Sequence, residues 1–297
     1  MKKRNDQNVI VKRAVLVFIL MFLVLLAALA FFTRSIVMRE QLKASYTAEA
    51  TVANVEAQLN RYLAESELLK NIVESGYEIS DSDFAALSKL MYDEDGIIKA
   101  VELAPNGVVR SVYPKASNAD VLGLNMLRHP ERKVEANLAK ESGQYTIAGP
   151  FQLVQGGTGA LLFDPIYTTG ADGSQKYWGF SVLVLDWESF LDEIQINKLQ
   201  DASYEYLIWK EGHNGERIVI AQGDRPVGPN TLEVACAVPN DNWYFEIRPA
   251  TGWITPTQEA FNVLLLLVLP ALLILTAPLI RKTTYHWLSK EKETKTV

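Results

Sequence analysis

The amino-acid sequence predicts an α+β protein with a long N-terminal stalk helix, two antiparallel-sheet lobes and a transmembrane helix on either side of them. Three observations support this fold class. Uncharged apolar stretches occupy residues 14–32 and 260–280. Neither glycine nor proline occurs between the first of these stretches and Gly76, as is typical of a continuous helix. Short runs rich in β-branched and aromatic residues, separated by glycine-containing turns, fill most of residues 143–187 and 204–248.

The two apolar stretches have the length of membrane spans. Residues 14–32 would form a helix of about 28 Å, close to the ~30 Å hydrocarbon core of a bilayer, and the second predicted span, residues 259–280, is slightly longer. A cleaved signal peptide is the rival interpretation of the first stretch, because residues 28–30 read Ala-Leu-Ala. A retained anchor is favoured, because the stretch is too long for a signal peptide and continues past that site.

The distribution of charge predicts the orientation. Residues 1–13 and 281–297 hold 10 of the 29 basic residues and only three of the 35 acidic ones. The positive-inside rule therefore places both ends in the cytoplasm and the main domain outside the plasma membrane. The region between these flanks keeps 19 basic and 32 acidic residues, a balance that excludes a nucleic-acid binder. The short tail, residues 281–297, has no room for a folded output domain, so a separate signalling kinase or cyclase is the expected partner.

Residues 33–76 are expected to form the stalk helix, with Gly76 ending it. Apolar residues recur along this segment at helical spacing: Ala48, Val52, Val55, Leu59, Tyr62 or Leu63, Leu69 and Val73. The stripe departs from a strict heptad repeat. It therefore predicts mixed use, with contact to a second copy near the membrane in a parallel homodimer and packing on the sensor lobe further out.

Residues 77–187 form the predicted membrane-distal lobe. Its expected elements are a helix begun by Ser80, a hairpin of residues 97–103 and 108–112, an amphipathic helix over residues 131–142, and three strands near residues 146–154, 160–167 and 177–185. Val134 and Leu138 are expected on the apolar face of the amphipathic helix. The last two strands are so apolar that both faces of their sheet should be covered.

Residues 188–250 form the predicted smaller lobe next to the membrane. Its elements are a helix over residues 188–200 and strands at residues 204–209, 217–221, 232–238 and 243–248. The single cysteine, Cys236, excludes a disulfide within the chain and is expected to be a buried, inert thiol.

Four short motifs follow one another in the distal lobe: Gly149-Pro150-Phe151, Gln155-Gly156-Gly157, Asp164-Pro165-Ile166-Tyr167 and Tyr177-Trp178-Gly179-Phe180. Their order and spacing resemble the CHASE domain, the extracytoplasmic sensory domain of membrane-bound histidine kinases, nucleotide cyclases and cyclic-di-GMP enzymes. The resemblance covers residues 36–248 and implies two PAS-like lobes. It also implies a two-span sensor in signal transduction.

The same resemblance implies a binding site. In CHASE proteins of the plant-receptor type the ligand lies in the distal lobe, between the central sheet and the segment that reaches it. The corresponding residues of this sequence are Tyr113, Arg132, Ala148, Phe151, Val154 and Phe163. Arg132 lies near the position where those receptors keep a carboxylate; because arginine offers donors only, it favours an anionic ligand. The alternatives are a solvated Arg132 paired with Glu131 or Glu135, and ordinary core packing for the two phenylalanines.

No motif of a catalytic, cofactor or metal site occurs in the sequence. Three histidines lie apart from one another, and no HExxH, GxSxG or cysteine pair is present. Residues 156–159, Gly-Gly-Thr-Gly, are better explained by a hairpin turn than by an anion-binding loop, because no helix follows. The sequence therefore predicts a ligand-binding sensor that is not an enzyme and lacks its own output domain. The alternative is a docking module for a partner protein, without a small-molecule ligand.

Overall fold

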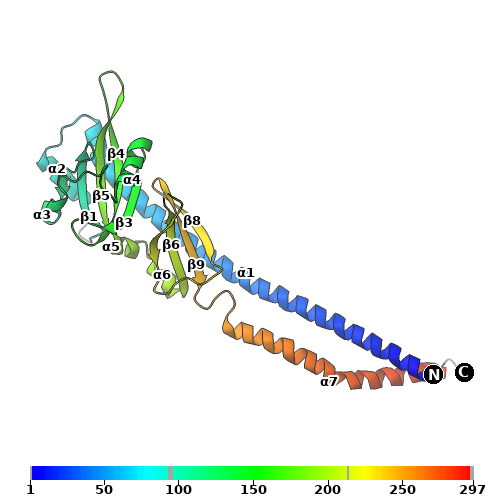
Figure 1. The fold of residues 1–297 in the computed structure, drawn as a ribbon. Helices are drawn as coiled ribbons and strands as arrows, with labels where there is room; N and C mark the ends of the chain where they lie inside the picture. The colour runs from blue at the N-terminus through cyan, green and yellow to red at the C-terminus, as the bar shows by residue number, and fades with distance from the viewer. Residues whose placement is uncertain (1, 93–95, 213, 295–297) are drawn as a thin grey trace. The chain divides into compact units, whose positions relative to one another are not determined.

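The structure is a computed structural model that describes the backbone of residues 2–92, 96–212 and 214–294 (Figure 1); side chains are described for residues 15–268 outside those gaps and at scattered positions beyond them. The chain divides into two compact units, Met1–Leu42 with Thr251–Val297, and Lys43–Ala250. Helix α1 (Lys2–Glu74) runs through the first unit into the second. The long N-terminal helix that the sequence predicts is therefore confirmed.

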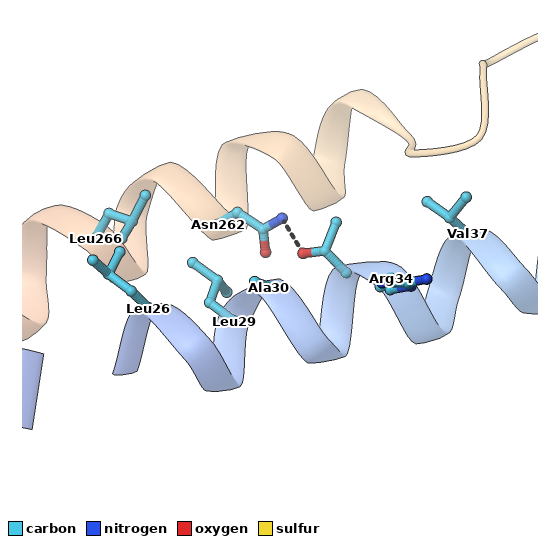
Figure 2. Close-up of a pocket in the computed structure, with 8 residues that line it drawn as sticks. Leu26, Leu29, Ala30, Arg34, Val37, Asn262 and Leu266 are labelled. Atoms are coloured by element: carbon cyan, nitrogen blue, oxygen red, sulfur yellow. Dashed lines mark hydrogen bonds between the residues drawn. The ribbon is translucent and has the colours of Figure 1, made fainter. Parts of the chain in front are cut away.

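The first unit contains the N-terminal part of α1 and helix α7 (Pro256–Thr294). Among the described residues one helix is long and apolar enough to cross a membrane, Val15–Glu74. The described apolar part of α7, Pro256–Leu272, is shorter than a typical span, so the second transmembrane helix stays a prediction. Asn262 on α7 donates a hydrogen bond of 3.2 Å to Thr33 on α1, beside an apolar groove between the two helices (Figure 2).

The second unit contains two antiparallel sheets, which confirms the α+β class. The five-stranded sheet has the strand order β2-β1-β5-β4-β3, and the four-stranded sheet has the order β7-β6-β9-β8 (Figure 1). The strands are β1 (Ile98–Pro105), β2 (Ser111–Tyr113), β3 (Thr146–Gln152), β4 (Thr158–Thr169), β5 (Gln175–Asp186), β6 (Tyr204–Glu211), β7 (Arg217–Gln222), β8 (Leu232–Val238) and β9 (Asp241–Pro249). The predicted boundaries of the two lobes, residues 77–187 and 188–250, and their PAS-like character stay predictions.

Short helices connect and cover the sheets. They are α2 (Asp81–Met91), α3 (Lys115–Asn118), the 3-10 helix η1 (Ala119–Val121), α4 (Lys133–Ser142), α5 (Trp187–Glu193) and α6 (Asn197–Asp201). Ser80 caps α2 as expected: its side chain accepts from the backbone N–H of Asp83, whose carboxylate in turn accepts from the backbone N–H of Ser80.

The outer part of α1 packs on both sheets. Ser66 and Lys70 of α1 donate hydrogen bonds to Asp164 of β4, and Glu56 accepts one from the backbone N–H of Ala237 in β8. The predicted apolar stripe is buried along its whole length: Ala48, Val52, Val55, Leu59, Tyr62, Leu69 and Val73. This stripe therefore packs against the chain's own domain. The sequence predicts this contact for the part of the helix away from the membrane.

Both faces of the five-stranded sheet are covered. Residues that lie opposite one another on antiparallel strands share a face, and successive residues on one strand point to opposite faces. Phe163 of β4 therefore lies on the face that packs against α4 and the connection from β2, whereas its neighbour Asp164 lies on the face that packs against α1. The expectation that this sheet meets other elements on both sides is confirmed.

Three predicted elements differ from the observed ones. The strand expected at residues 108–112 is shorter and later, at β2, because residues 105–110 are used in a turn and in backbone contacts to the connection that follows. The helix expected over residues 188–200 is two helices, separated at Gln195, whose φ of 59° lies in the left-handed region.

The third difference concerns α4. Val134 and Leu138, the predicted apolar face, are exposed, and the buried residues are Ala136 and Ala139. Small side chains let a helix approach a sheet closely, so alanine can form the packed face although valine and leucine are more apolar.

Candidate ligand-binding site

Arg132 lies at the N-terminal end of α4, where the connection from β2 reaches the five-stranded sheet. Its side chain is 1% exposed, so the interpretation of Arg132 as a solvated helix residue is wrong. Its Nη1 lies 3.8 Å from the sulfur of Met126, and its Cζ lies 5.4 Å from the centre of the Phe151 ring. Burial lowers the pKa of the guanidinium, although arginine keeps its charge in proteins.

Glu102 brings a second charge to the same face of the sheet. It lies in the middle of β1, opposite Val112 of β2 and Val182 of β5, and Val182 in turn lies opposite Phe163 of β4. Its side chain is 1% exposed. Burial raises the pKa of the Glu102 carboxyl from its ordinary 4.5 to about 7, and the positive charge of Arg132 opposes this rise.

Arg132 and Glu102 influence one another's ionisation without touching. No hydrogen bond or ion pair joins their side chains in the described structure, although each contributes to the electrostatic environment of the other. Nε of Arg132 and Oε2 of Glu102 are both buried and both lack a hydrogen-bond partner. Buried polar atoms in folded proteins are nearly always hydrogen-bonded, so this pair indicates a place where a further polar group belongs.

The surroundings of these two charges are apolar. One hydrophobic cluster occupies this face of the sheet: Ala100, Ala104, Val109, Val112, Val121, Met126, Ala136, Ala139, Ala148, Leu153, Leu161, Phe163, Phe180, Val182 and Val184, with Leu124, Leu127, Phe151 and Tyr177 packed against it. Five of its members are alanines, which leave the charged side chains with small neighbours. We call Arg132, Glu102 and this cluster the Arg132–Glu102 site.

A bulge in β3 directs Phe151 into the site. The register between β3 and β4 shifts between Ala148 and Phe151, and Gly149 adopts a φ of 106°, which side chains other than hydrogen rarely tolerate. A Cβ atom at this position would lie 3.0 Å from the backbone oxygen of Gly159. The Gly-Pro-Phe motif of the sequence thus positions an aromatic ring against the Arg132 guanidinium.

The structure brings together four of the six residues that the sequence predicts for the site: Arg132, Ala148, Phe151 and Phe163. Val154 is exposed in the turn after β3, and Leu153 is buried in the cluster instead. Tyr113 lies opposite Val101 on the other face of the sheet and contacts Tyr92, whereas Val112 faces the cluster. Val154 thus lies outside the cluster in a turn, and Tyr113 lies one residue from Val112, a step that in a strand reverses the face.

Glu102 is a residue of this site that the sequence motifs did not predict. The signal that could have found it is a single acidic residue in a strand, Ile98–Pro105, that is apolar apart from Glu102 and Lys99. The residue type alone was not informative in a chain with 35 acidic residues.

Polar groups also gather on the opposite face of the sheet, around Asp164. Its carboxylate is fully buried and accepts from Ser66 Oγ at 3.0 Å and from Lys70 Nζ at 2.9 Å. Burial raises the pKa of Asp164, and the hydrogen bond from Lys70 opposes the rise. Every oxygen of this carboxylate has a donor, so this cluster is a contact between α1 and β4 rather than an open site.

Within the described residues, no group of three or more histidine, cysteine, aspartate or glutamate side chains could hold a metal ion. Cys236 is buried, and burial raises the pKa of its thiol to about 12. The expected burial of this thiol is thus confirmed, and its inertness stays a prediction. The turn at residues 153–157 is closed by its own backbone hydrogen bonds, from Leu153 to Gly157 and from Gly156 to Leu153.

Comparison with known proteins supports the resemblance seen in the sequence. The sequence pattern of the CHASE domain matches residues 46–220. Among solved structures, the chain is similar to an extracellular ligand binding receptor from Desulfohalobium retbaense, with 14% sequence identity, a TM-score of 0.45, and coverage of 73% of this chain and 40% of that one. It is also similar to the Vibrio cholerae LuxQ periplasmic domain, with 12% identity, a TM-score of 0.33, and coverage of 67% and 96%. No curated protein matches the chain.

Proposed function

The chain belongs to the CHASE domain family, and from that premise we propose that it is a membrane-anchored receptor domain that binds a small molecule with an anionic group outside the cytoplasm. CHASE domains are sensory domains. The proposed activity is therefore recognition of a signal, and the proposed location of recognition is the Arg132–Glu102 site.

The buried guanidinium of Arg132 carries this proposal. Taking a cation out of water costs several kcal/mol unless an anion or hydrogen-bond acceptors replace the lost water. The described neighbours of Arg132 supply a sulfur atom, an aromatic ring and the negative charges of Glu102 and Glu131, neither of which forms a described hydrogen bond or ion pair with it. An anionic group of the ligand would complete this arrangement, because a guanidinium presents five donors in a planar fork that matches a carboxylate.

The Arg132→Ala variant tests the proposal. Ligand binding should weaken by about 1.5–3 kcal/mol, the range for a hydrogen bond to a charged group. Ligands are found by a thermal-shift screen of the purified chain in detergent against metabolites; a ligand at a hundredfold its Kd raises stability by roughly 2.7 kcal/mol. Arg128→Ala is the matched control, because Arg128 is an exposed arginine of the same segment. Equal affinity in the Arg132→Ala variant and in the control would leave Arg132 with a purely structural role.

The proposed anchor has two membrane spans with both termini in the cytoplasm. Support comes from the apolar helix that begins at Val15, from the apolar sequence of residues 260–280, and from the basic residues that flank both. Reporter fusions that are active on only one side of the membrane test this topology. A C-terminal fusion that is active outside, or a mature chain that begins after Ala30, would contradict it.

The proposed working form is a parallel homodimer that passes its signal to a kinase or cyclase. Met38, Leu42 and Tyr46 lie four residues apart on α1, and each side chain is more than half exposed. Positions i and i+4 lie on the same side of a helix, so these residues form an apolar stripe separate from the one that the sheets cover. A second copy of the same helix is a partner of suitable shape for such a stripe.

A further inference from the structure

We propose that the Arg132–Glu102 site binds a small zwitterion, with the carboxylate of an α-amino acid on Arg132 and its ammonium group on Glu102. This inference rests on the proposed function and narrows its ligand from an anion to a class that carries both charges on one short backbone.

The two protein charges come from different elements, and each contributes to the electrostatic environment of the other. Glu102 lies at the centre of β1 and Arg132 at the start of α4, and both side chains are more than nine-tenths buried. Each has a buried polar atom without a partner: a donor on Arg132 and an acceptor on Glu102. A group placed between them must accept at one end and donate at the other.

The sign of each charge decides between ligand classes. A simple anion would satisfy Arg132 but bring a second negative charge near Glu102, and a simple amine would place a second positive charge near Arg132. An α-amino acid satisfies both residues: its carboxylate accepts from the guanidinium, and its ammonium group donates to the carboxylate of Glu102. It also adds no net charge to an apolar cluster, where an unpaired charge is costly.

The neighbours of the pair set the size of the ligand. Ala100, Ala104, Ala136, Ala139 and Ala148 belong to the cluster on the face of the sheet that holds Glu102. Their side chains are the shortest in the cluster, and the aromatic rings of Phe151 and Phe163 lie on the same face. A short backbone with both charged groups therefore fits this arrangement better than a long chain with the charges far apart.

The experiment is isothermal titration of the purified chain in detergent with three matched series. These are the twenty common α-amino acids, the 2-hydroxy acids in which a hydroxyl replaces the ammonium group, and the amines that lack the carboxylate. At least one α-amino acid should bind, and its hydroxy acid and its amine should each bind at least about tenfold more weakly, because each has lost a hydrogen bond to a charged group.

Two variants assign the ends of the ligand. Glu102→Gln should weaken the α-amino acid by at least about tenfold and leave the hydroxy acid within about twofold, whereas Arg132→Gln should weaken both. Glu141→Gln, at an exposed residue of α4 with no described contact to Arg132 or Glu102, is the control and should change neither. If Glu102→Gln does not fold, as judged by circular dichroism, Glu102→Asp takes its place; the shortened acid should also weaken the α-amino acid more than the hydroxy acid.

The outcomes separate this inference from the proposed function. If no α-amino acid binds, or if the hydroxy acid binds as tightly as its α-amino acid, a zwitterion is excluded as the ligand of this site. The unpaired oxygen of Glu102 then has ordered water as its hydrogen-bond partner. In that case the anion site stands as long as the acids bind to the wild type and are lost in Arg132→Gln. If ligands bind and Arg132→Gln weakens none of them, both the inference and the proposed function fail.

Discussion

Glu102 is an acid inside an apolar core, so its protonation should be visible in the stability of the domain. Burial raises the pKa of Glu102 from 4.5 to about 7 against the opposing charge of Arg132, which means that the folded state holds the proton more tightly than the unfolded chain. This contribution to stability is fully present below about pH 4.5 and is lost as the pH rises through about 7. The loss should amount to about 3 kcal/mol, since each pH unit between the two pKa values contributes about 1.4 kcal/mol.

Glu102→Gln should remove this dependence, because glutamine stays neutral at every pH. The variant should be more stable than the wild type at pH 8, and the difference should shrink towards pH 5. Urea unfolding of both proteins at the two pH values measures the effect, with the exposed Glu141→Gln as control. Parallel stability curves for Glu102→Gln and the wild type would show that Glu102 keeps an ordinary pKa.

Single residues also show how far the sequence could lead to the site. Arg132 and Phe151 were found because they lie in or near family motifs, and both lie in the site. Val154 and Tyr113 were misplaced by one residue, because the bulge at Gly149 and the late start of β2 are backbone features without a clear mark in the pattern of apolar residues. The electrostatic influence of Arg132 on Glu102 could not be predicted, since it depends on how α4 and the connection before it pack on the sheet.

At the scale of elements, β4 connects the proposed site to α1. Phe163 lies on the site's face and the next residue, Asp164, is held on the other face by Ser66 and Lys70 of α1. A shift of β4 towards a ligand would therefore act on α1 through a buried carboxylate. The ion pair between Lys70 and Asp164 therefore joins α1 to β4, and its contribution to the stability of the fold can be measured.

Lys70→Met should destabilise the fold, because it leaves the buried Asp164 with one donor fewer. Breaking a fully buried pair costs about 3–5 kcal/mol, and we expect about 2 kcal/mol here, since the Lys70 side chain is 24% exposed and Ser66 still donates. Adding Asp164→Asn should restore most of the loss, because the asparagine carries no charge. Urea unfolding of the single and double variants measures both steps.

Arg61→Met is the matched control, because Arg61 also joins α1 to another element, through Glu193 of α5, but in an exposed pair. Its loss should change stability by less than about 1 kcal/mol. Equal effects of Lys70→Met and Arg61→Met would mean that the buried pair has no special place in the contact between α1 and β4.

The elements themselves were predicted with uneven success, for physical reasons. The stripe from Ala48 to Val73 was found because a long helix with a regular period is a strong signal, and every turn of it is buried. The packed face of α4 was assigned to Val134 and Leu138 although Ala136 and Ala139 form it, because hydropathy ranks residues by their preference for an apolar environment and does not register how closely a helix approaches a sheet.

For the whole molecule, transmission of a signal requires that a ligand change the relation of this chain to something else. A ligand shifts an equilibrium only as far as it binds two states differently. Helix α1 is the element that contacts the five-stranded sheet and continues without a break into the apolar stretch that begins at Val15. Two copies joined along α1 could therefore read out the change as a movement of one helix against the other.

The exposure of side chains along α1 predicts which residues lie at the contact between the two copies of such a dimer. Single cysteines placed from residue 36 to residue 59, in a Cys236→Ser background, should crosslink most at Met38, Leu42 and Tyr46, because these side chains are exposed and lie on one side of the helix. Crosslinking should be absent at Ala48 and Val52, which the chain's own domain covers. The same three maxima should appear at native expression and in purified protein. Maxima at Ala48 and Val52 would mean that the copies exchange helices, whereas uniformly absent crosslinking would leave α1 without a second copy and direct the search to a different membrane partner.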